Sequence, residues 1–169
     1  QIAYCAAMLD IARRYYPIES LKQAVRIARF YKIRYIQLHM TDDQAWMFPS
    51  TAFPQLGKHN AQLDGSRKPA YSLAELRELV AFADARGVTL VPELEAPGHS
   101  GQLRGTLPEI FNYKHEGKFL TQETINMVGE RSYEALDKII GEMSQVFKSS
   151  PFFHVGFDEY SISGLETLD

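Results

Sequence analysis

The chain has 169 residues, 45% of them hydrophobic and 23% charged, which is ordinary for a soluble globular domain. The formal net charge of −3 offers no electrostatic attraction for nucleic acid or an anionic membrane surface. No apolar run approaches the roughly 18 residues that span a bilayer. The opening stretch, QIAYCAAMLD, also lacks the basic region and longer apolar core of a signal peptide. We therefore expect one domain with a sizeable core, and neither nucleic acid nor a membrane as its partner.

The sequence contains a single cysteine, Cys5. One cysteine allows neither an internal disulfide nor a cysteine-based zinc site. Because it lies within the apolar run IAYCAAML, we expect Cys5 to be a small, unreactive residue of the core.

Apolar patterns of two kinds alternate along the chain. Short apolar runs predict strands, and apolar residues spaced three or four positions apart predict helices. The helix expected over 71–87 has the clearest boundaries, because Ser72 and Glu75 form a capping box and Gly87 follows its last turn. The expected strands cover 2–9, 32–40, 88–94 and 151–157, and the expected helices cover 17–31, 71–87 and 132–147.

This alternation predicts an α/β fold with parallel strands joined by helical crossovers. The connections from helix to strand are short, whereas the loops over 41–71 and 95–124 are long. Long loops in compact domains are usually functional, and here they follow strands, where α/β barrels and open α/β sheets both place their sites. Four strands and three helices amount to about half of a (β/α)8 barrel. The pattern therefore predicts either an open four-stranded sheet or part of a barrel.

Polar side chains gather where each expected strand ends. If the strands are parallel, these groups converge on one rim of the sheet, whereas chance would scatter them to both ends. In chain order they are Asp10 and Arg13; His39, Asp42 and Asp43; Glu93, Glu95 and His99; and His154, Asp158 and Glu159.

Two of these acids, Asp158 and Glu159, are adjacent. Where a chain leaves the pleat of a strand, neighbouring residues can reach the same ligand, and two close carboxylates favour protonation of one of them. This arrangement suits a general acid, and we assign that role to Glu159. Conventional glycosidases place their two carboxylates about 5 to 9 Å apart across the scissile bond. A glycosidase built on neighbouring acids must take its nucleophile from elsewhere, and one available source is a 2-acetamido sugar, whose amide Asp158 would orient.

Four stretches resemble successive motifs of glycoside hydrolase family 20, the β-N-acetylhexosaminidases: MLDIARRYYP, YIQLHMTDDQAW, VTLVPELEAPGHS and FFHVGFDE. They occur in the family's order and together span nearly the whole chain. The resemblance implies a (β/α)8 TIM barrel, of which this chain is the first half. It implies a retaining hydrolase that removes terminal N-acetylglucosamine or N-acetylgalactosamine from a glycan or glycoconjugate, with no metal or cofactor.

By the same resemblance, Arg13 binds hydroxyls of the terminal sugar, and Asp42 and His99 form a relay that supports the acid/base. Asp158 matches the aspartate that orients the acetamido group, and Glu159 matches the general acid/base.

Four further expectations accompany the resemblance. His154 and Glu95 are candidates for groups that support the acids from behind. Phe157 stands where the family commonly has glycine, so its ring must enter the barrel wall or crowd the pocket. Residues 1–169 are expected to form a single partial catalytic domain, completed on its C-terminal side by the remaining half of the barrel. The implied parent is a secreted, periplasmic or lysosomal protein.

Two other functions compete with this one. The first is a metal-dependent hydrolase or isomerase on a similar barrel, because His39, Asp42, Glu93, His99 and Asp158 are acceptable ligands for Zn²⁺ or Mn²⁺. The second is a non-catalytic carbohydrate-binding module, in which exposed strand edges pair with another half barrel.

Overall fold

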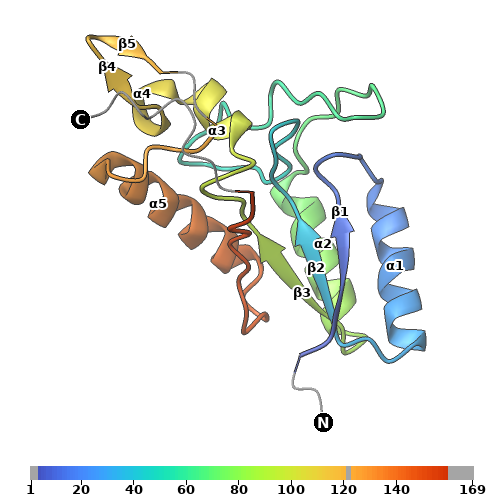
Figure 1. Cartoon of the computed structure of the whole chain (residues 1–169). Helices are drawn as coiled ribbons and strands as arrows, with labels where there is room; N and C mark the ends of the chain where they lie inside the picture. The colour runs from blue at the N-terminus through green and yellow to red at the C-terminus, as the bar shows by residue number, and fades with distance from the viewer. Residues whose placement is uncertain (1–3, 121–122, 160–169) are drawn as a thin grey trace.

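A computed structural model describes residues 4–120 and 123–159 of the chain. Its centre is a parallel sheet in the order β1-β2-β3. In Figure 1 the three arrows run side by side in one direction, with α2 behind them and α1 and α5 on either side. The central elements are β1 (Ala6–Asp10), α1 (Ile18–Phe30), β2 (Tyr35–His39), α2 (Leu73–Asp84), β3 (Thr89–Glu93) and α5 (Glu130–Val146).

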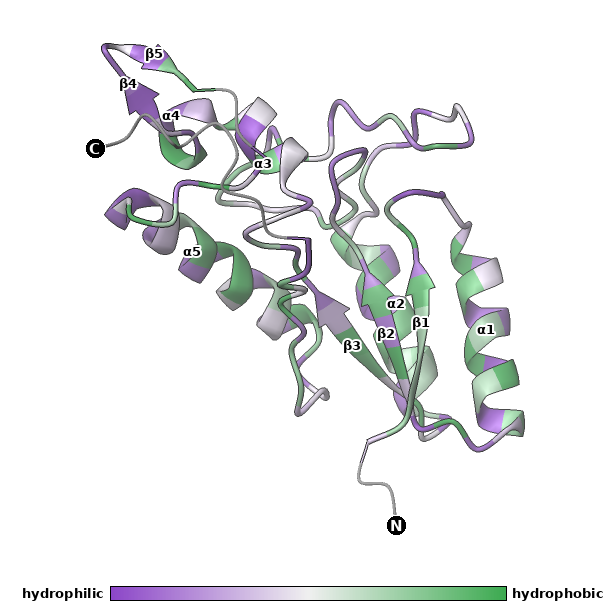
Figure 2. Ribbon diagram, viewed as in Figure 1, coloured by the Kyte–Doolittle hydropathy of each residue, from purple (hydrophilic) through white to green (hydrophobic). Residues whose placement is uncertain are grey.

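The helices form where their apolar stripes can be buried. On α1 the residues Leu21, Val25 and Ala28 face the core, as the helical spacing predicts. The predicted capping box of α2 is confirmed: the Ser72 side chain accepts from the Glu75 N–H, and the Glu75 side chain accepts from the Ser72 N–H. Figure 2 shows that the strands are apolar along most of their length and become polar at the tips of β1 and β3.

The long loop over 95–124 contains elements that the sequence pattern did not reveal. They are α3 (Gly101–Thr106), α4 (Pro108–Phe111), and the antiparallel strands β4 (Lys114–His115) and β5 (Lys118–Phe119). Each is too short to produce a recognisable apolar period. All lie beyond the carboxyl ends of the central strands, above the sheet in Figure 1.

The expected strand over 151–157 is present only as a single bridge between Glu93 and His154. The Leu94 N–H donates to the His154 carbonyl, and the His154 N–H donates to the Pro92 carbonyl, both at 3.0 Å. The expectation that this apolar run lies in the interior is wrong for Phe152 and Val155, which are exposed. Among the described residues the bridge has no strand on its other side, and Phe152 packs only edge-on against the rings of Tyr4 and Tyr35.

The apolar stripe expected on α5 is confirmed in part. We expected Tyr133, Leu136, Ile140, Met143 and Phe147 to share one apolar face. Met143 and Phe147 are buried, and Leu136 and Ile140 are partly buried against the core, but Tyr133 is exposed. Tyr133, Leu136 and Ile140 line an apolar cavity of about 230 Å³, together with Val155 and Phe157. The buried residues of α5 are Ser132, Ala135, Ile139, Met143 and Val146.

Two expectations about composition can also be compared with the structure. Cys5 is exposed, not buried, because it precedes the first residue of β1, and β1 is an edge strand with only β2 beside it. Within the described residues, no helix combines the length and apolar character needed to cross a membrane.

A carboxylate on α5 fastens the long loop over 41–71 to the body of the domain. Glu142 accepts hydrogen bonds from the Ser50 hydroxyl at 2.6 Å, from the Thr51 N–H at 3.0 Å and from the Ala52 N–H at 2.8 Å. The Thr51 hydroxyl donates to the same carboxylate. Burial opposes ionisation of Glu142, but these donors outweigh it and lower the pKa of Glu142 below its ordinary value of 4.5.

We expect Glu142→Ala to lower the free energy of unfolding by about 2 kcal/mol, because several donors lose a charged acceptor. The measurement is chemical denaturation at neutral pH, with Glu134→Ala on the exposed side of the same helix as control; we expect the control to change stability by less than about 0.5 kcal/mol. Since the pKa of Glu142 is lowered on folding, the difference between wild type and variant should shrink as the pH falls below 4.5. Equal stabilities for the two variants at neutral pH would contradict this role.

Candidate active site

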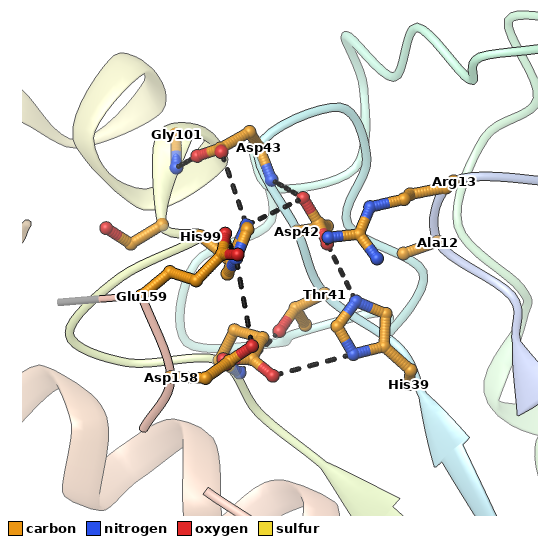
Figure 3. A network of polar contacts seen from close by, with 12 residues as sticks. Ala12, Arg13, His39, Thr41, Asp42, Asp43, His99, Gly101, Asp158 and Glu159 are labelled. Atoms are coloured by element: carbon orange, nitrogen blue, oxygen red, sulfur yellow. Dashed lines mark hydrogen bonds and ion pairs between the residues drawn. The ribbon is translucent and has the colours of Figure 1, made fainter. Parts of the chain in front are cut away.

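The carboxylate of Asp42 is the centre of a polar cluster at the carboxyl ends of the strands (Figure 3). It is fully buried. Its Oδ2 lies 2.7 Å from an Nη of Arg13 and 2.8 Å from Nε2 of His39, and its Oδ1 accepts from the Asp43 N–H at 2.6 Å. Oδ1 also lies 3.6 Å from Nδ1 of His99. Burial opposes ionisation, but the hydrogen bonds from His39 and the Asp43 N–H and the charge of Arg13 together lower the pKa of Asp42.

Arg13 reaches this carboxylate because the last residue of β1 turns the chain. One oxygen of Asp10 accepts from the Ala12 and Arg13 N–H groups, at 3.1 and 2.8 Å. The other oxygen pairs with Nη1 of Arg13 at 3.1 Å, which leaves Nη2 to meet Asp42. Burial opposes the charge of Arg13, but Asp42 and Asp10 outweigh it and raise the pKa of Arg13. The guanidinium is thus held by two carboxylates while a third of its side chain stays exposed.

His99, in the loop after β3, connects Asp42 to the two terminal acids. Its Nε2 lies 3.0 Å from Oε2 of Glu159 and 3.9 Å from Oδ2 of Asp158. Its Nδ1 faces Asp42 and Asp43, each at 3.6 Å. The result is a continuous polar path from Arg13 through Asp42 and His99 to Glu159 (Figure 3).

A sharp turn brings the adjacent acids to the same imidazole. Gly156, Phe157 and Glu159 have φ values of +64°, +75° and +47°, in the left-handed region that favours glycine. Phenylalanine at such a φ costs about 1–2 kcal/mol, which agrees with the glycine that the family commonly has there. The ring of Phe157 lines the cavity beside α5. The ring lies beside this cavity and stays largely exposed.

The two acids are open to solvent, whereas the groups behind them are not. The side chains of Asp158 and Glu159 are 64% and 76% exposed, but that of His99 is only 15% exposed and that of Asp42 is fully buried. The two acids therefore lie on the solvent side of the buried Asp42 and His99, and no described residue covers them.

Behind Asp42, polar residues form a row across the sheet. Asp10 pairs in register with His39, His39 with Glu93, and Glu93 with His154 through the isolated bridge. Side chains at the same register of a parallel sheet point to the same face, so the four lie in one layer. The motif resemblance gives His39 and Glu93 no role. Each lies at the same distance from the end of its predicted strand, and this equal distance could have predicted that the two share a layer.

Glu95 follows this row and is also buried. Its Oε1 lies 3.5 Å from Nδ1 of His39, and its Oε2 has no hydrogen-bond partner among the described residues. Burial, the neighbouring carboxylate of Glu93 and the charge of Asp158 raise the pKa of Glu95. Burial also opposes ionisation of Glu93, but hydrogen bonds from His39 and Gln37 lower the pKa of Glu93. The pair therefore favours one carboxylate and one carboxylic acid near neutrality.

The sequence-predicted site residues fall into two groups in the structure. Arg13, Asp42, His99, Asp158 and Glu159 form the connected path described above. The two candidates for support, His154 and Glu95, lie in the layer behind it: His154 Nδ1 is 3.0 Å from Oε1 of Glu93, and Glu95 faces His39.

Two groups of described residues have the composition of a metal site. His39, Glu93 and Glu95 place one ligand atom each within 4.8 Å of one another, and so do Asp42, Asp43 and His99. Both groups belong to the polar cluster at the strand ends, and their side chains are already engaged with one another or with Arg13. Hydrogen bonds and ion pairs within the protein thus account for much of their bonding capacity.

A parallel α/β sheet with acids, imidazoles and an arginine at the carboxyl ends of its strands defines part of an α/β-barrel enzyme. Residues 3–167 match the catalytic domain of glycosyl hydrolase family 20. The chain belongs to this family.

Individual relatives agree with the family match. A β-hexosaminidase of Vibrio furnissii is 31% identical over 92% of this chain, and a chitooligosaccharidolytic β-N-acetylglucosaminidase of Ostrinia furnacalis is 32% identical over 94%. The crystal structure of an exo-β-N-acetylglucosaminidase from Vibrio harveyi in complex with N-acetylglucosamine superimposes with a TM-score of 0.78. It is 29% identical, and the match covers 96% of this chain and 28% of that one. The chain spans 28% and 27% of the two sequence relatives.

We expect Gly156→Ala to disrupt this site. A Cβ at position 156 would overlap the carboxyl group of Glu95, and φ is +64°. The substitution should lower the free energy of unfolding by about 2 kcal/mol or more, as measured by chemical denaturation. Gly105→Ala, whose Cβ would meet nothing within 4 Å, is the matched control and should retain wild-type stability. A Gly156→Ala variant as stable as this control would show that the carboxyl group of Glu95 does not pack against Gly156.

Proposed function

We propose that this chain provides the acid/base half of the active site of a β-N-acetylhexosaminidase. In this proposal the enzyme removes terminal N-acetylglucosamine or N-acetylgalactosamine from a glycan or glycoconjugate with retention of configuration. The observation that carries the proposal is the path from Asp42 through His99 to Glu159, with Asp158 beside Glu159 on the same imidazole. Membership of glycosyl hydrolase family 20 supports it.

Adjacent acids on one turn favour a reaction in which the substrate supplies the nucleophile. The 2-acetamido oxygen attacks the anomeric carbon, and the bond to the leaving oxygen breaks as Glu159 gives that oxygen a proton. Asp158 orients the amide and stabilises the positive charge of the oxazolinium ion that forms. Water then attacks the same carbon and returns a proton to Glu159, and the ring-opened acetamido group is restored.

The groups behind Glu159 suit the change of its protonation state. His99 lies 3.0 Å from Glu159, and its other ring nitrogen faces the buried carboxylate of Asp42 at 3.6 Å. Arg13 is fixed by Asp10 and Asp42 with part of its side chain exposed. In this proposal it donates hydrogen bonds to hydroxyl groups of the terminal sugar.

The proposal includes the remaining half of the barrel. The chain spans 28% of the Vibrio furnissii relative, and both terminal acids are more than half exposed. Electrostatic stabilisation is strongest where water is excluded, so a further set of strands and helices would have to cover Asp158 and Glu159. We assign this covering to the rest of the same catalytic domain.

In the full-length protein, Glu159→Gln should reduce kcat for an N-acetyl-β-glucosaminide disaccharide by about 10²- to 10⁴-fold, since the leaving oxygen loses its proton donor. Release of N-acetylglucosamine is the measurement, and Glu134→Gln on the exposed side of α5 should retain wild-type turnover. Near wild-type turnover in Glu159→Gln would contradict the assigned acid/base.

Loss of wild-type activity in the presence of a chelator would favour a metal-dependent hydrolase, and binding without turnover by wild type would favour a non-catalytic module.

Asp158→Asn should also lower kcat by on the order of 10²-fold or more, because the developing positive charge loses its carboxylate. The diagnostic comparison uses a matched pair of aryl glycosides, one with the 2-acetamido group and one with a hydroxyl there. Wild type should strongly prefer the acetamido substrate, and Asp158→Asn should lose most of that preference. Equal wild-type rates on the two substrates would contradict participation of the amide.

A further inference from the structure

His39 lies in the buried layer behind the site, and the mechanism proposed above gives it no role. Its side chain is only 6% exposed. It is the central member of the row that runs from Asp10 through His39 to Glu93 and His154. It is also the one residue of that row that touches Asp42 through a ring nitrogen.

Both ring nitrogens of His39 face carboxylates. Nε2 lies 2.8 Å from Oδ2 of Asp42, and Nδ1 lies 3.4 Å from Oε2 of Glu93 and 3.5 Å from Oε1 of Glu95. A neutral imidazole donates through only one nitrogen, whereas the charged form donates through both. The charged form is therefore the one that suits this environment.

The charges around His39 come from every strand that packs against it. Asp10 ends β1, Asp42 follows β2 and Glu93 ends β3, whereas Glu95, which follows β3, favours the neutral carboxylic acid. Arg13 contributes a positive charge on the far side of Asp42. Burial opposes the charge on His39, but hydrogen bonds to Asp42 and Glu93 and the charge of Asp10 outweigh it, raising the pKa of His39 to about 10.

We propose that His39 is a positioning residue, an imidazolium that anchors one oxygen of Asp42 so that the other faces His99 and, through it, Glu159. The inference rests on the proposed function, because its consequence is the protonation of that acid/base. His39 touches no substrate in this proposal and is not a catalytic residue.

The geometry of Asp42 shows why such an anchor is needed. Arg13 and His39 both bind Oδ2, which leaves Oδ1 to the Asp43 N–H and His99. Arg13 comes from an irregular segment and is partly exposed, whereas His39 is the last residue of the central strand. The rigid partner of Asp42 is therefore His39.

The test compares His39→Gln with wild type in the full-length protein, using an N-acetyl-β-glucosaminide. Glutamine can still donate a hydrogen bond to Asp42 but carries no charge. We expect kcat to fall roughly 10- to 100-fold, with little change in KM. Without the imidazolium the pKa of Asp42 rises, so the acid limb of the kcat profile should move to higher pH by roughly one unit. His115→Gln, in the exposed β4–β5 hairpin, is the matched control and should leave both quantities unchanged.

The pH profile separates positioning from a merely structural role. A variant that is only less stable would lose active enzyme but keep the wild-type acid limb, and that result would overturn the inference. An inactive wild type would instead contradict the proposed function, so the two failures are distinguishable.

A second measurement needs no variant activity and remains informative if His39→Gln does not fold. In wild-type protein labelled with ¹⁵N-histidine, both ring nitrogens of His39 should carry hydrogen at pH 8. A ring with one protonated nitrogen at that pH would overturn the inference. So would a stoichiometric transition metal in the purified protein, lost together with activity on chelation, because His39 would then be a ligand held by Glu93 and Glu95.

Discussion

The burial of the Asp42 carboxylate is the constraint on which the rest of this site depends. An unpaired buried charge is too costly to persist, so its partners must be held close. They come from three separate parts of the chain: Arg13 after β1, His39 on β2, and His99 after β3. One buried charge thereby fixes the ends of three strands relative to one another. The contacts of Asp42 that hold the strand ends together are therefore also the contacts that position the polar side chains of the site.

The buried and exposed parts of the site differ in how firmly their side chains are held. The row through Asp10, His39 and Glu93 lies on β-strands with fixed register, so its side chains have little freedom to rearrange. Asp158 and Glu159 lie on a turn with left-handed backbone, at the exposed end of the path. In the proposed function the substrate binds on this exposed side, and a cover that excludes water would strengthen the electrostatic interactions of the two acids.

Among the described residues, the segment over 151–157 has a strand on only one side. Its apolar residues suit a buried β-strand, yet only one bridge to β3 forms, and Phe152 and Val155 stay partly exposed. Strand pairing and burial support each other, since an edge without a partner gains neither hydrogen bonds nor apolar contact on that side. Val155 and Phe157 of this segment line the apolar cavity beside α5.

The sequence alone determined the three helices, the first three strands and the gathering of Arg13, Asp42, His99, Asp158 and Glu159 at one rim. Those features follow from local periodicity, capping and the direction of parallel strands, which neighbouring residues encode. Only the tertiary structure decided that His39 and Glu93 share a layer with Asp10, and which face of α5 is buried. Register and packing arise between segments far apart in the chain. The energy of a buried charge or an apolar stripe depends on what those distant segments place against it.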